Sequence, residues 1–385
     1  MSDDYGSEFD YEGRTRACRS ALRDAGADCL VLLPGPNLQY LTGFRDEPSE
    51  RHFLLFVPRE GEPILLAPTM YDEQLSETWL SDVRLWDDHE DPRDRLDAIV
   101  FEIDPDRVLV DDRMWARFTQ DLRAATDAEF GLASEVLADL RIRKDDAEID
   151  AIERASALAD RVSEEIRTLG EEAIDVTERD LAREIDSQLA SAGGEEPAFE
   201  TIVASGPNGA RPHHRRSSRE IEAGDPVVLD FGTRVDGYPS DQTRTVVFGA
   251  EPRSAKESSD EPRSGEPPAG FEDVHDVVRE AQRAAIDRIE PGVPAEAVDA
   301  AAREVIERAG YGEAFTHRTG HGVGCEVHEP PYLVAGNSRE LEPGMVFSVE
   351  PGIYLEGEFG VRIEDLVCVT DDGARRLNGS SRGWR

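Results

Sequence analysis

The amino-acid sequence predicts an α/β (α+β) protein built from two domains. The chain has 385 residues, and because domains usually hold ~100–200 residues, this length suggests two of them. Residues 1–140 alternate short apolar runs with helical stretches, which is typical of an α/β domain. Residues 141–385 begin with helical patterns and continue with several strands. We therefore expect one domain over 1–140 and a second over 141–385.

Four apolar runs predict the strands of the first domain. They span residues 30–33, 53–57, 63–67 and 107–110. The first two are followed by Pro34 and Pro58, and proline lacks the N–H that continued strand pairing needs. Helical stretches lie between the runs, so helices and strands alternate.

The second domain begins with a helix that is predicted from Asp145, because apolar residues recur at helical spacing up to Leu169. A second helix is expected between Thr177 and Gly193. Residues 251–270 contain Pro, Ser, Gly and Glu without periodicity, which indicates a surface insertion. The remaining expectations are strands over 199–248, helices over 272–289 and 294–309, and loop with strand over 315–377.

The charge of the chain excludes several partners. Aspartate plus glutamate number 83 against 43 lysine plus arginine, a net charge of −40. Such a charge repels nucleic-acid backbones and anionic membrane surfaces. No apolar run approaches the ~18 residues of a membrane-spanning helix. We therefore expect no nucleic-acid partner and no membrane association.

The composition also predicts a cellular setting. Lys144 and Lys256 are the only lysines, and an acidic, lysine-poor surface is similar to that of proteins from salt-accumulating halophiles. The alternative, an acidic disordered chain, is disfavoured by the periodic apolar segments. The acidic N-terminus lacks an apolar signal region, and the four cysteines form no CxxC pair. We expect free thiols and a cytoplasmic location.

Two aspartates are expected on one face of a β-hairpin. Asp230 ends an apolar strand, and Asp236-Gly237 is a favoured two-residue hairpin turn. This turn sets a register in which Asp241 lies opposite Gly232, so Asp230 and Asp241 share a face diagonally. In so acidic a chain, the pair alone is equally consistent with a solvated hairpin face.

Three later segments add further polar groups. Residues 317–331 hold three of the eight histidines, His317, His321 and His328, among several glycines. Glu350 follows an apolar strand. Arg362 and Glu364 are predicted on one face of a further strand, with apolar residues on the other face.

The inventory of candidate ligands points to a pair of metal ions. Four carboxylates carry a charge of about −4, which matches two divalent cations. Oxygen donors with one imidazole suit Mn²⁺, Co²⁺, Fe²⁺ or Zn²⁺. Such a site supports metal-assisted hydrolysis. The candidate ligands are Asp230, Asp241, His321, Glu350 and Glu364.

The order of these five residues and their local motifs resemble the M24 metallopeptidases, which include methionine aminopeptidase, aminopeptidase P, prolidase and creatinase. The resemblance over 145–377 implies a C-terminal pita-bread metallopeptidase domain. Residues 37–44 (NLQYLTGF) resemble the N-terminal creatinase/prolidase-like α/β domain, which methionine aminopeptidase lacks. The resemblance implies a metal centre of two ions, with Mn²⁺ or Co²⁺ favoured over Zn²⁺ or Fe²⁺.

The resemblance also implies roles for individual residues. Glu350 would bind metal and transfer a proton, while His213 and His328 would contact the substrate and its tetrahedral intermediate. Arg362 would lie beside the last ligand, near the substrate. Plainer interpretations are a solvated loop histidine for His213, a structural histidine for His328, and an ordinary ion pair for Arg362.

The activity that the resemblance implies is hydrolysis of the bond that precedes proline in a small peptide, by a dipeptidase or an aminopeptidase. A homodimer is implied as well. One alternative is a metal-dependent hydrolase of a small non-peptide amide such as an ectoine derivative. A non-catalytic, peptide-binding pseudoenzyme is a second alternative, which the presence of all five ligand residues disfavours.

Overall fold

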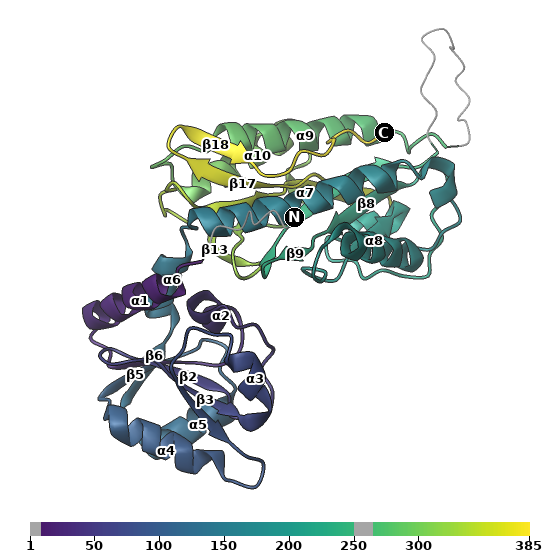
Figure 1. The fold of residues 1–385 in the computed structure, drawn as a ribbon. Coiled ribbons are helices and arrows are strands. Elements are labelled where there is room, and N and C mark those ends of the chain that lie inside the picture. Colours follow the sequence, from purple (N-terminus) through teal and green to yellow (C-terminus); the bar gives the residue numbers. More distant parts are fainter. Residues whose placement is uncertain (1–8, 250–264) are drawn as a thin grey trace, which may run out of the picture. The chain divides into compact units, whose positions relative to one another are not determined.

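The computed structural model describes residues 9–249 and 265–385 (Figure 1). These residues divide into two compact units, one that ends at Arg141 and one that spans Ile142–Arg385. Both units combine helices with sheets, so the α/β prediction is confirmed. Most of the predicted insertion at 251–270 lies outside the described residues. None of the described helices is both long and apolar enough to cross a membrane.

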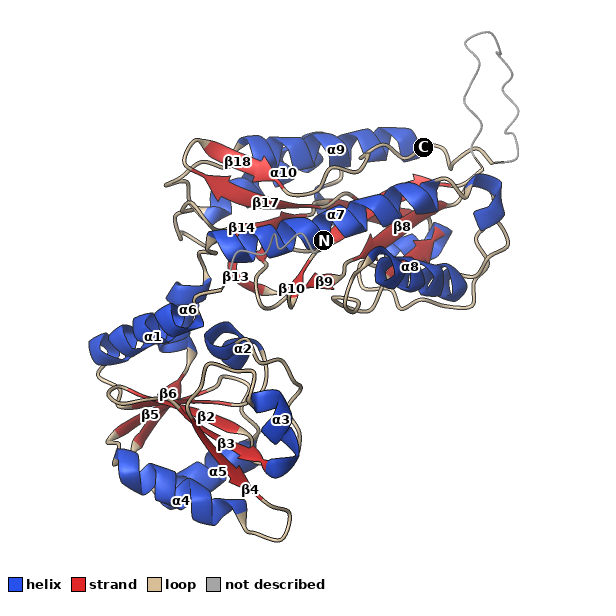
Figure 2. Cartoon of the chain, viewed as in Figure 1, coloured by secondary structure: helices blue, strands red, loops and turns tan. Residues whose placement is uncertain are grey.

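The first unit is a six-stranded sheet covered by helices on both faces, with α1 and α6 on one side and α4 and α5 on the other (Figure 2). The strand order is β4-β3-β2-β1-β5-β6. Its strands are β1 (Cys29–Leu32), β2 (Leu54–Pro58), β3 (Ile64–Pro68), β4 (Asp82–Trp86), β5 (Arg107–Val110) and β6 (Glu129–Leu132). Its helices are α1 (Tyr11–Ala25), α2 (Pro36–Thr42), α3 (Asp72–Leu75), α4 (Pro92–Ile103), α5 (Ala116–Ala125) and α6 (Ser134–Arg141).

The four predicted strands correspond to β1, β2, β3 and β5, so these predictions are confirmed. The two edge strands, β4 and β6, were not predicted. Edge strands are less buried than central ones, and β4 and β6 contain polar residues such as Arg84 and Glu129. They therefore lack the continuous apolar run that identifies a central strand.

The second unit is built from two helix pairs and several small sheets. Strands β11-β8-β7 form one sheet, β13-β12-β14-β17-β18 a second, and β15-β16 and β9-β10 are two-stranded. The helices are α7 (Asp146–Arg167), α8 (Glu178–Ala192), α9 (Phe271–Asp287) and α10 (Ala295–Arg308). The strands are β7 (Ile202–Ser205), β8 (Pro226–Phe231), β9 (Arg234–Val235), β10 (Tyr238–Pro239), β11 (Gln242–Val247), β12 (Gly320–Gly322), β13 (Glu329–Leu333), β14 (Val346–Val349), β15 (Gly352–Leu355), β16 (Phe359–Arg362), β17 (Asp365–Thr370) and β18 (Gly373–Arg376).

Local signals explain where the first helix pair begins and ends. Asp145 and Glu148 form a reciprocal capping box at the start of α7. Thr177 accepts a hydrogen bond from the backbone N–H of Asp180 at the start of α8, and Gly193 ends that helix in the left-handed conformation. The predicted helices in this unit are therefore confirmed.

Each helix pair covers its own hydrophobic core. Helices α7 and α8 pack on β7, β8 and β11, with Phe231 fully buried among them. Helices α9 and α10 pack on β14, β15, β16 and β17, with Phe271 and Phe347 fully buried. Polar strand faces turned away from these cores are then available to line a pocket within the unit.

Candidate active site

A pocket with a volume of about 590 Å³ lies within the second unit. Carboxylates, histidines and arginines dominate its walls, together with a few apolar residues such as Phe199, Ile202 and Val327. All eight site residues predicted from the sequence line this pocket: His213, Asp230, Asp241, His321, His328, Glu350, Arg362 and Glu364.

The hairpin that carries the two aspartates has the predicted register. Asp230 pairs with Thr243 across β8 and β11, and Val235 pairs with Tyr238 across the turn. The turn residues Asp236 and Gly237 both have positive φ, 49° and 81°, as a two-residue hairpin turn of this type requires. Asp241 directly precedes β11 and is 4% exposed.

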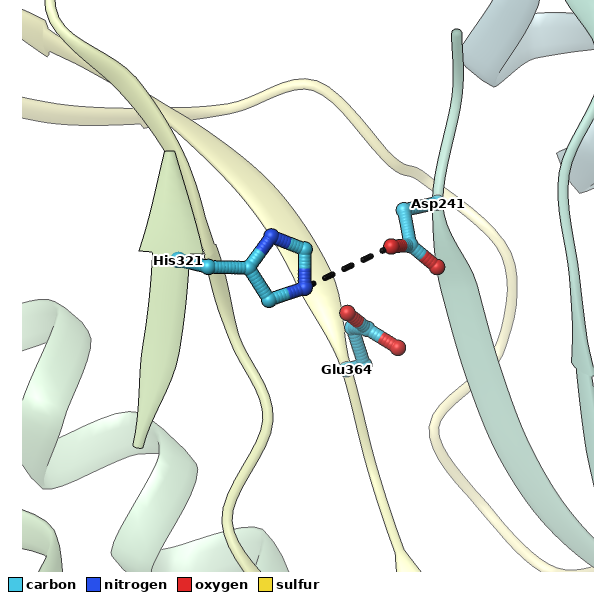
Figure 3. Close-up of side chains that lie close together, drawn as sticks. All are labelled: Asp241, His321 and Glu364. Carbon is cyan, nitrogen blue, oxygen red and sulfur yellow. Dashed lines mark ion pairs between the residues drawn. The ribbon is translucent and has the colours of Figure 1, made fainter. Parts of the chain in front are cut away.

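Asp241, His321 and Glu364 converge from three separate segments (Figure 3). One ligand atom from each lies within 4.8 Å of the others. Nε2 of His321 is 3.6 Å from Oδ2 of Asp241 and 3.4 Å from Oε1 of Glu350. The structure thus brings four of the five predicted ligands into one cluster.

The imidazole of His321 presents a lone pair to these carboxylates. Its Nδ1 lies 3.2 Å from the carbonyl oxygen of Gly322, which assigns the proton to Nδ1 and leaves Nε2 as an acceptor. Burial lowers the pKa of His321 to about 3, so the ring is neutral. A lone pair that faces two carboxylates is repelled by them, and a cation between the groups removes that repulsion.

Asp230 is the fifth candidate ligand, and Arg362 holds it in place. Its Oδ2 accepts a hydrogen bond of 2.6 Å from Nη2 of Arg362. Its Oδ1 is buried and has no hydrogen-bond partner within residues 9–249 and 265–385. A buried carboxylate oxygen without a donor is costly, and metal ligation would satisfy it.

The other candidate carboxylates lie close together in a buried pocket, and this raises their pKa values. Burial and the neighbouring carboxylates raise the pKa of Asp241 and of Glu364 well above their usual range. Burial, and to a lesser extent Asp230, raises the pKa of Glu350 to about 7. Because these groups oppose one another's ionisation, the donor set fits divalent cations, which would stabilise all of them as carboxylates.

One prediction about this region is wrong in its secondary structure. Arg362 and Glu364 were expected on a single strand, but β16 ends at Arg362 and β17 begins at Asp365. Glu364 lies in the short connection, where its backbone N–H donates to the carbonyl of Thr243 at 3.0 Å. The predicted alternation of faces still holds, because Val361 and Ile363 are fully buried in the apolar core.

Arg362 connects two candidate ligands, Asp230 and Glu364, through a network of hydrogen bonds. Its Nε donates to Oγ1 of Thr243 at 3.0 Å, and that hydroxyl donates to Oε2 of Glu364 at 2.7 Å. Its Nη1 donates to the hydroxyl of Tyr354 at 2.9 Å. Together with its hydrogen bond to Asp230, these contacts let the guanidinium orient both Asp230 and Glu364.

His213 and His328 occupy the more open part of the pocket. Both are exposed. The ring of His328 lies with its centroid 4.1 Å from that of His321. His317 also lines the pocket, and its Nε2 lies 2.8 Å from the hydroxyl of Tyr354.

The sequence interpretation missed Thr243, which donates to the predicted ligand Glu364, and Tyr354, which accepts from Arg362. Thr243 lies two residues beyond Asp241, on the same face of the hairpin, so the period of two could have identified it. Tyr354 lies in the apolar strand β15, and nothing in its local sequence distinguishes it from a core residue.

Comparison with known families agrees with the division seen in the structure. Residues 14–143 match the Creatinase/Prolidase N-terminal domain, and residues 150–371 match Metallopeptidase family M24. The chain therefore belongs to metallopeptidase family M24. The predicted family and fold, a creatinase/prolidase-like domain followed by a pita-bread domain, are confirmed.

Individual relatives resemble almost the whole chain. The "Probable dipeptidase PepE" of Mycobacterium tuberculosis is 41% identical over 376 residues, which cover 96% of this chain and 94% of that protein. The Xaa-Pro dipeptidase of Lactobacillus delbrueckii subsp. lactis is 36% identical, with 94% and 95% covered. The crystal structure of a prolidase from Thermococcus sibiricus has a TM-score of 0.90 and 39% identity, with 98% and 99% covered.

Proposed function

We propose that the protein is a metal-dependent dipeptidase that hydrolyses Xaa-Pro dipeptides. The observation that carries this proposal is the convergence of Asp241, His321 and Glu364 in one pocket with two further carboxylates and two accessible histidines. Family M24 membership supports the peptidase activity. The names of the relatives, Xaa-Pro dipeptidase and prolidase, support the substrate.

Two divalent cations per chain, Mn²⁺ or Co²⁺ in preference to Zn²⁺ or Fe²⁺, are the cofactors that we propose. The residues that would hold them are Asp230, Asp241, His321, Glu350 and Glu364. When bound, such ions supply an activated water nucleophile and polarise the substrate carbonyl. The four carboxylates balance the charge of two ions. Oδ1 of Asp230, which has no hydrogen-bond partner among the described residues, is available as a metal ligand.

The side chains of the pocket transfer the proton, stabilise the developing negative charge and orient the candidate ligands. Glu350 accepts a proton from the attacking water and delivers it to the leaving nitrogen. His213 and His328, the accessible histidines, donate hydrogen bonds to the oxygen on which negative charge develops. Arg362 orients Asp230 and contributes positive charge to the wall that faces the substrate.

Proline in the second position explains why a dedicated enzyme is needed. The bond before proline is a tertiary amide without an N–H, so peptidases that bind an extended backbone through that group handle it poorly. A dipeptide is favoured over a longer peptide because several relatives that cover at least 94% of this chain are named dipeptidases. The X-Pro aminopeptidase of Thermotoga maritima is less similar, at 30% identity and a TM-score of 0.80.

The oligomeric state and the cellular environment of the enzyme are part of the same proposal. We infer a homodimer, as the resemblance to family members with this N-terminal domain implies, in a salt-rich cytoplasm that screens the net charge of −40. Light scattering in molar KCl tests this inference. A mass near twice 42.6 kDa is expected, and a mass near 42.6 kDa would contradict the dimer.

A substrate panel tests the proposed specificity. The metal-loaded enzyme in molar KCl is assayed with Xaa-Pro dipeptides, Xaa-Pro-Xaa tripeptides, Xaa-Ala dipeptides and an ectoine derivative, each with Mn²⁺, Co²⁺ or Zn²⁺. The proposal expects the highest kcat/KM for Xaa-Pro dipeptides. A preference for tripeptides would identify an aminopeptidase, and cleavage of the ectoine derivative alone would replace the peptidase proposal.

A further inference from the structure

Glu178 is a buried carboxylate outside the pocket. It is the first residue of α8, has an exposed fraction of 0% and is not among the described residues that line the pocket. Burial alone would oppose its ionisation, but hydrogen bonds from Ser205, Asn208, Ser217 and His214 overcome this effect and lower its pKa to about 2. The carboxylate is therefore ionised at neutral pH, and both of its oxygens accept hydrogen bonds.

These donors come from the segment that leads to and follows His213. Oε1 of Glu178 accepts from the backbone N–H and hydroxyl of Ser205, at 2.8 and 2.9 Å, and from Nδ2 of Asn208 at 2.9 Å. Oε2 accepts from the backbone N–H and hydroxyl of Ser217, at 3.1 and 2.7 Å. Nε2 of His214 lies 2.8 Å from the same oxygen. One carboxylate thus binds both ends of residues 205–217.

His213 and His214 are neighbours in the sequence but differ in exposure and in contacts. Both residues line the pocket, but His214 is only 9% exposed and its Nε2 contacts Glu178, whereas His213 is exposed. On the other side of His213, the carbonyl oxygen of Pro212 accepts a hydrogen bond of 3.3 Å from Nη1 of Arg362. Both neighbours of His213 are therefore held, one by Glu178 and one by Arg362.

We propose that Glu178, acting through His214, is a positioning residue that fixes His213 in the active-site pocket. This inference rests on the proposed function, in which His213 contacts the reacting carbonyl. Within the described residues, Glu178 makes no hydrogen bond to a candidate metal ligand and does not line the pocket. Its effect on hydrolysis should therefore depend on His213 and leave metal binding unchanged.

A double-mutant cycle on the metal-loaded enzyme tests this dependence. The four proteins are the wild type, Glu178→Gln, His213→Ala and the double variant, each assayed with Ala-Pro and Mn²⁺. Glutamine keeps the shape of Glu178 but directs an N–H₂ group at existing donors. We expect Glu178→Gln to lower kcat by about tenfold or more with little change in KM, and to lower it by less than about twofold once His213 is alanine.

The control is Glu184→Gln, the same exchange at an exposed position of α8, which should leave kcat and KM unchanged. The metal content of Glu178→Gln should equal that of the wild type. An equal loss of kcat in both His213 backgrounds, or a parallel loss of metal, would overturn the inference and leave Glu178 with a purely structural role.

A second pair of variants covers the case in which Glu178→Gln does not fold. His214→Gln retains a donor for Glu178, whereas His214→Ala does not. We expect His214→Gln to retain most of the kcat and His214→Ala to lose it, and equal activities would contradict the proposal.

Hydrogen–deuterium exchange separates this inference from the proposed function. If the metal-loaded wild type cleaves no Xaa-Pro substrate, the proposed function fails, but faster exchange over 205–217 in His214→Ala than in His214→Gln would still support the positioning of this segment. Unchanged exchange there would overturn it independently of any activity.

Discussion

The guanidinium of Arg362 donates a 2.6 Å hydrogen bond to Asp230, and both side chains are largely buried. The same guanidinium donates to Thr243, which in turn donates to Glu364. One cation therefore orients two candidate ligands that lie on different segments. Partners of this kind set the direction of ligand atoms, and their loss typically lowers metal affinity by 10–100-fold.

Replacing Arg362 with lysine should separate charge from orientation. Lysine keeps the positive charge but cannot bind Asp230, Thr243 and Tyr354 together, because it lacks the planar fork of donors. We expect Mn²⁺ affinity to fall by about tenfold or more, measured by titration calorimetry. Arg308→Lys on the exposed face of α10 is the matched control, and equal affinities in the two variants would contradict the role of Arg362.

Thr243→Val tests the next hydrogen bond of the same network. Valine has the shape of threonine but removes the hydroxyl that donates to Glu364 at 2.7 Å. We expect a loss of about 1–3 kcal/mol in the free energy of unfolding, together with weaker metal binding. Thr243→Ser retains the hydroxyl and should restore metal affinity, and failure of serine to do so would show that the methyl group matters more than the hydrogen bond.

The register of the hairpin and the positions of several candidate ligands could be predicted from the sequence, because they depend on local patterns. The Asp236-Gly237 turn set the register of Asp230 and Asp241, and the apolar strand before Glu350 set the place of that carboxylate. Glu364 was predicted as a candidate ligand from its motif, and the structure places it in the pocket, between two strands and not within one.

Other features depend on contacts between distant residues, which no local pattern reveals. The donors that surround Glu178 lie 27 to 39 residues along the chain. In sequence, Glu178 resembles only an acidic residue in the first turn of a helix, where acids are common. His214 resembles part of the basic segment that follows it, and only the fold brings its ring to Glu178.

The buried histidine His275 should make the stability of the protein depend on pH. This histidine of α9 is fully buried, and neither ring nitrogen has a hydrogen-bond partner within the part of the chain that the structure describes. Burial lowers its pKa from 6.5 to about 3. Because the unfolded chain binds the proton more readily, the stability linked to this group is present above about pH 6.5 and is lost as the pH falls toward 3.

Replacing His275 with leucine should remove this pH dependence. We expect His275→Leu to be more stable than the wild type by about 1–3 kcal/mol, and the difference should grow between pH 7 and pH 5. Urea unfolding at several pH values measures it. His89→Gln, at an exposed position, should show no such growth, and a constant difference between His275→Leu and the wild type would refute the prediction.

Arg244 should be among the residues most important for stability. It is 1% exposed, and it donates to Asp365 at 2.7 Å and to the carbonyl of Ser380 at 3.2 Å. Arg244→Met leaves the buried carboxylate of Asp365 with fewer donors, so we expect a cost of about 3–5 kcal/mol. Denaturant unfolding of the apo protein measures it, and a cost below about 1 kcal/mol would be inconsistent with a buried ion pair.

The measurement that tests the central claim most directly is a metal titration of the stripped enzyme, followed by both metal content and Xaa-Pro hydrolysis. The account predicts no hydrolysis after complete metal removal, and recovery that saturates at about two Mn²⁺ ions per chain. Asp241→Asn should bind fewer ions and remain inactive. Undiminished hydrolysis by the metal-free protein, or full activity of Asp241→Asn, would contradict the account.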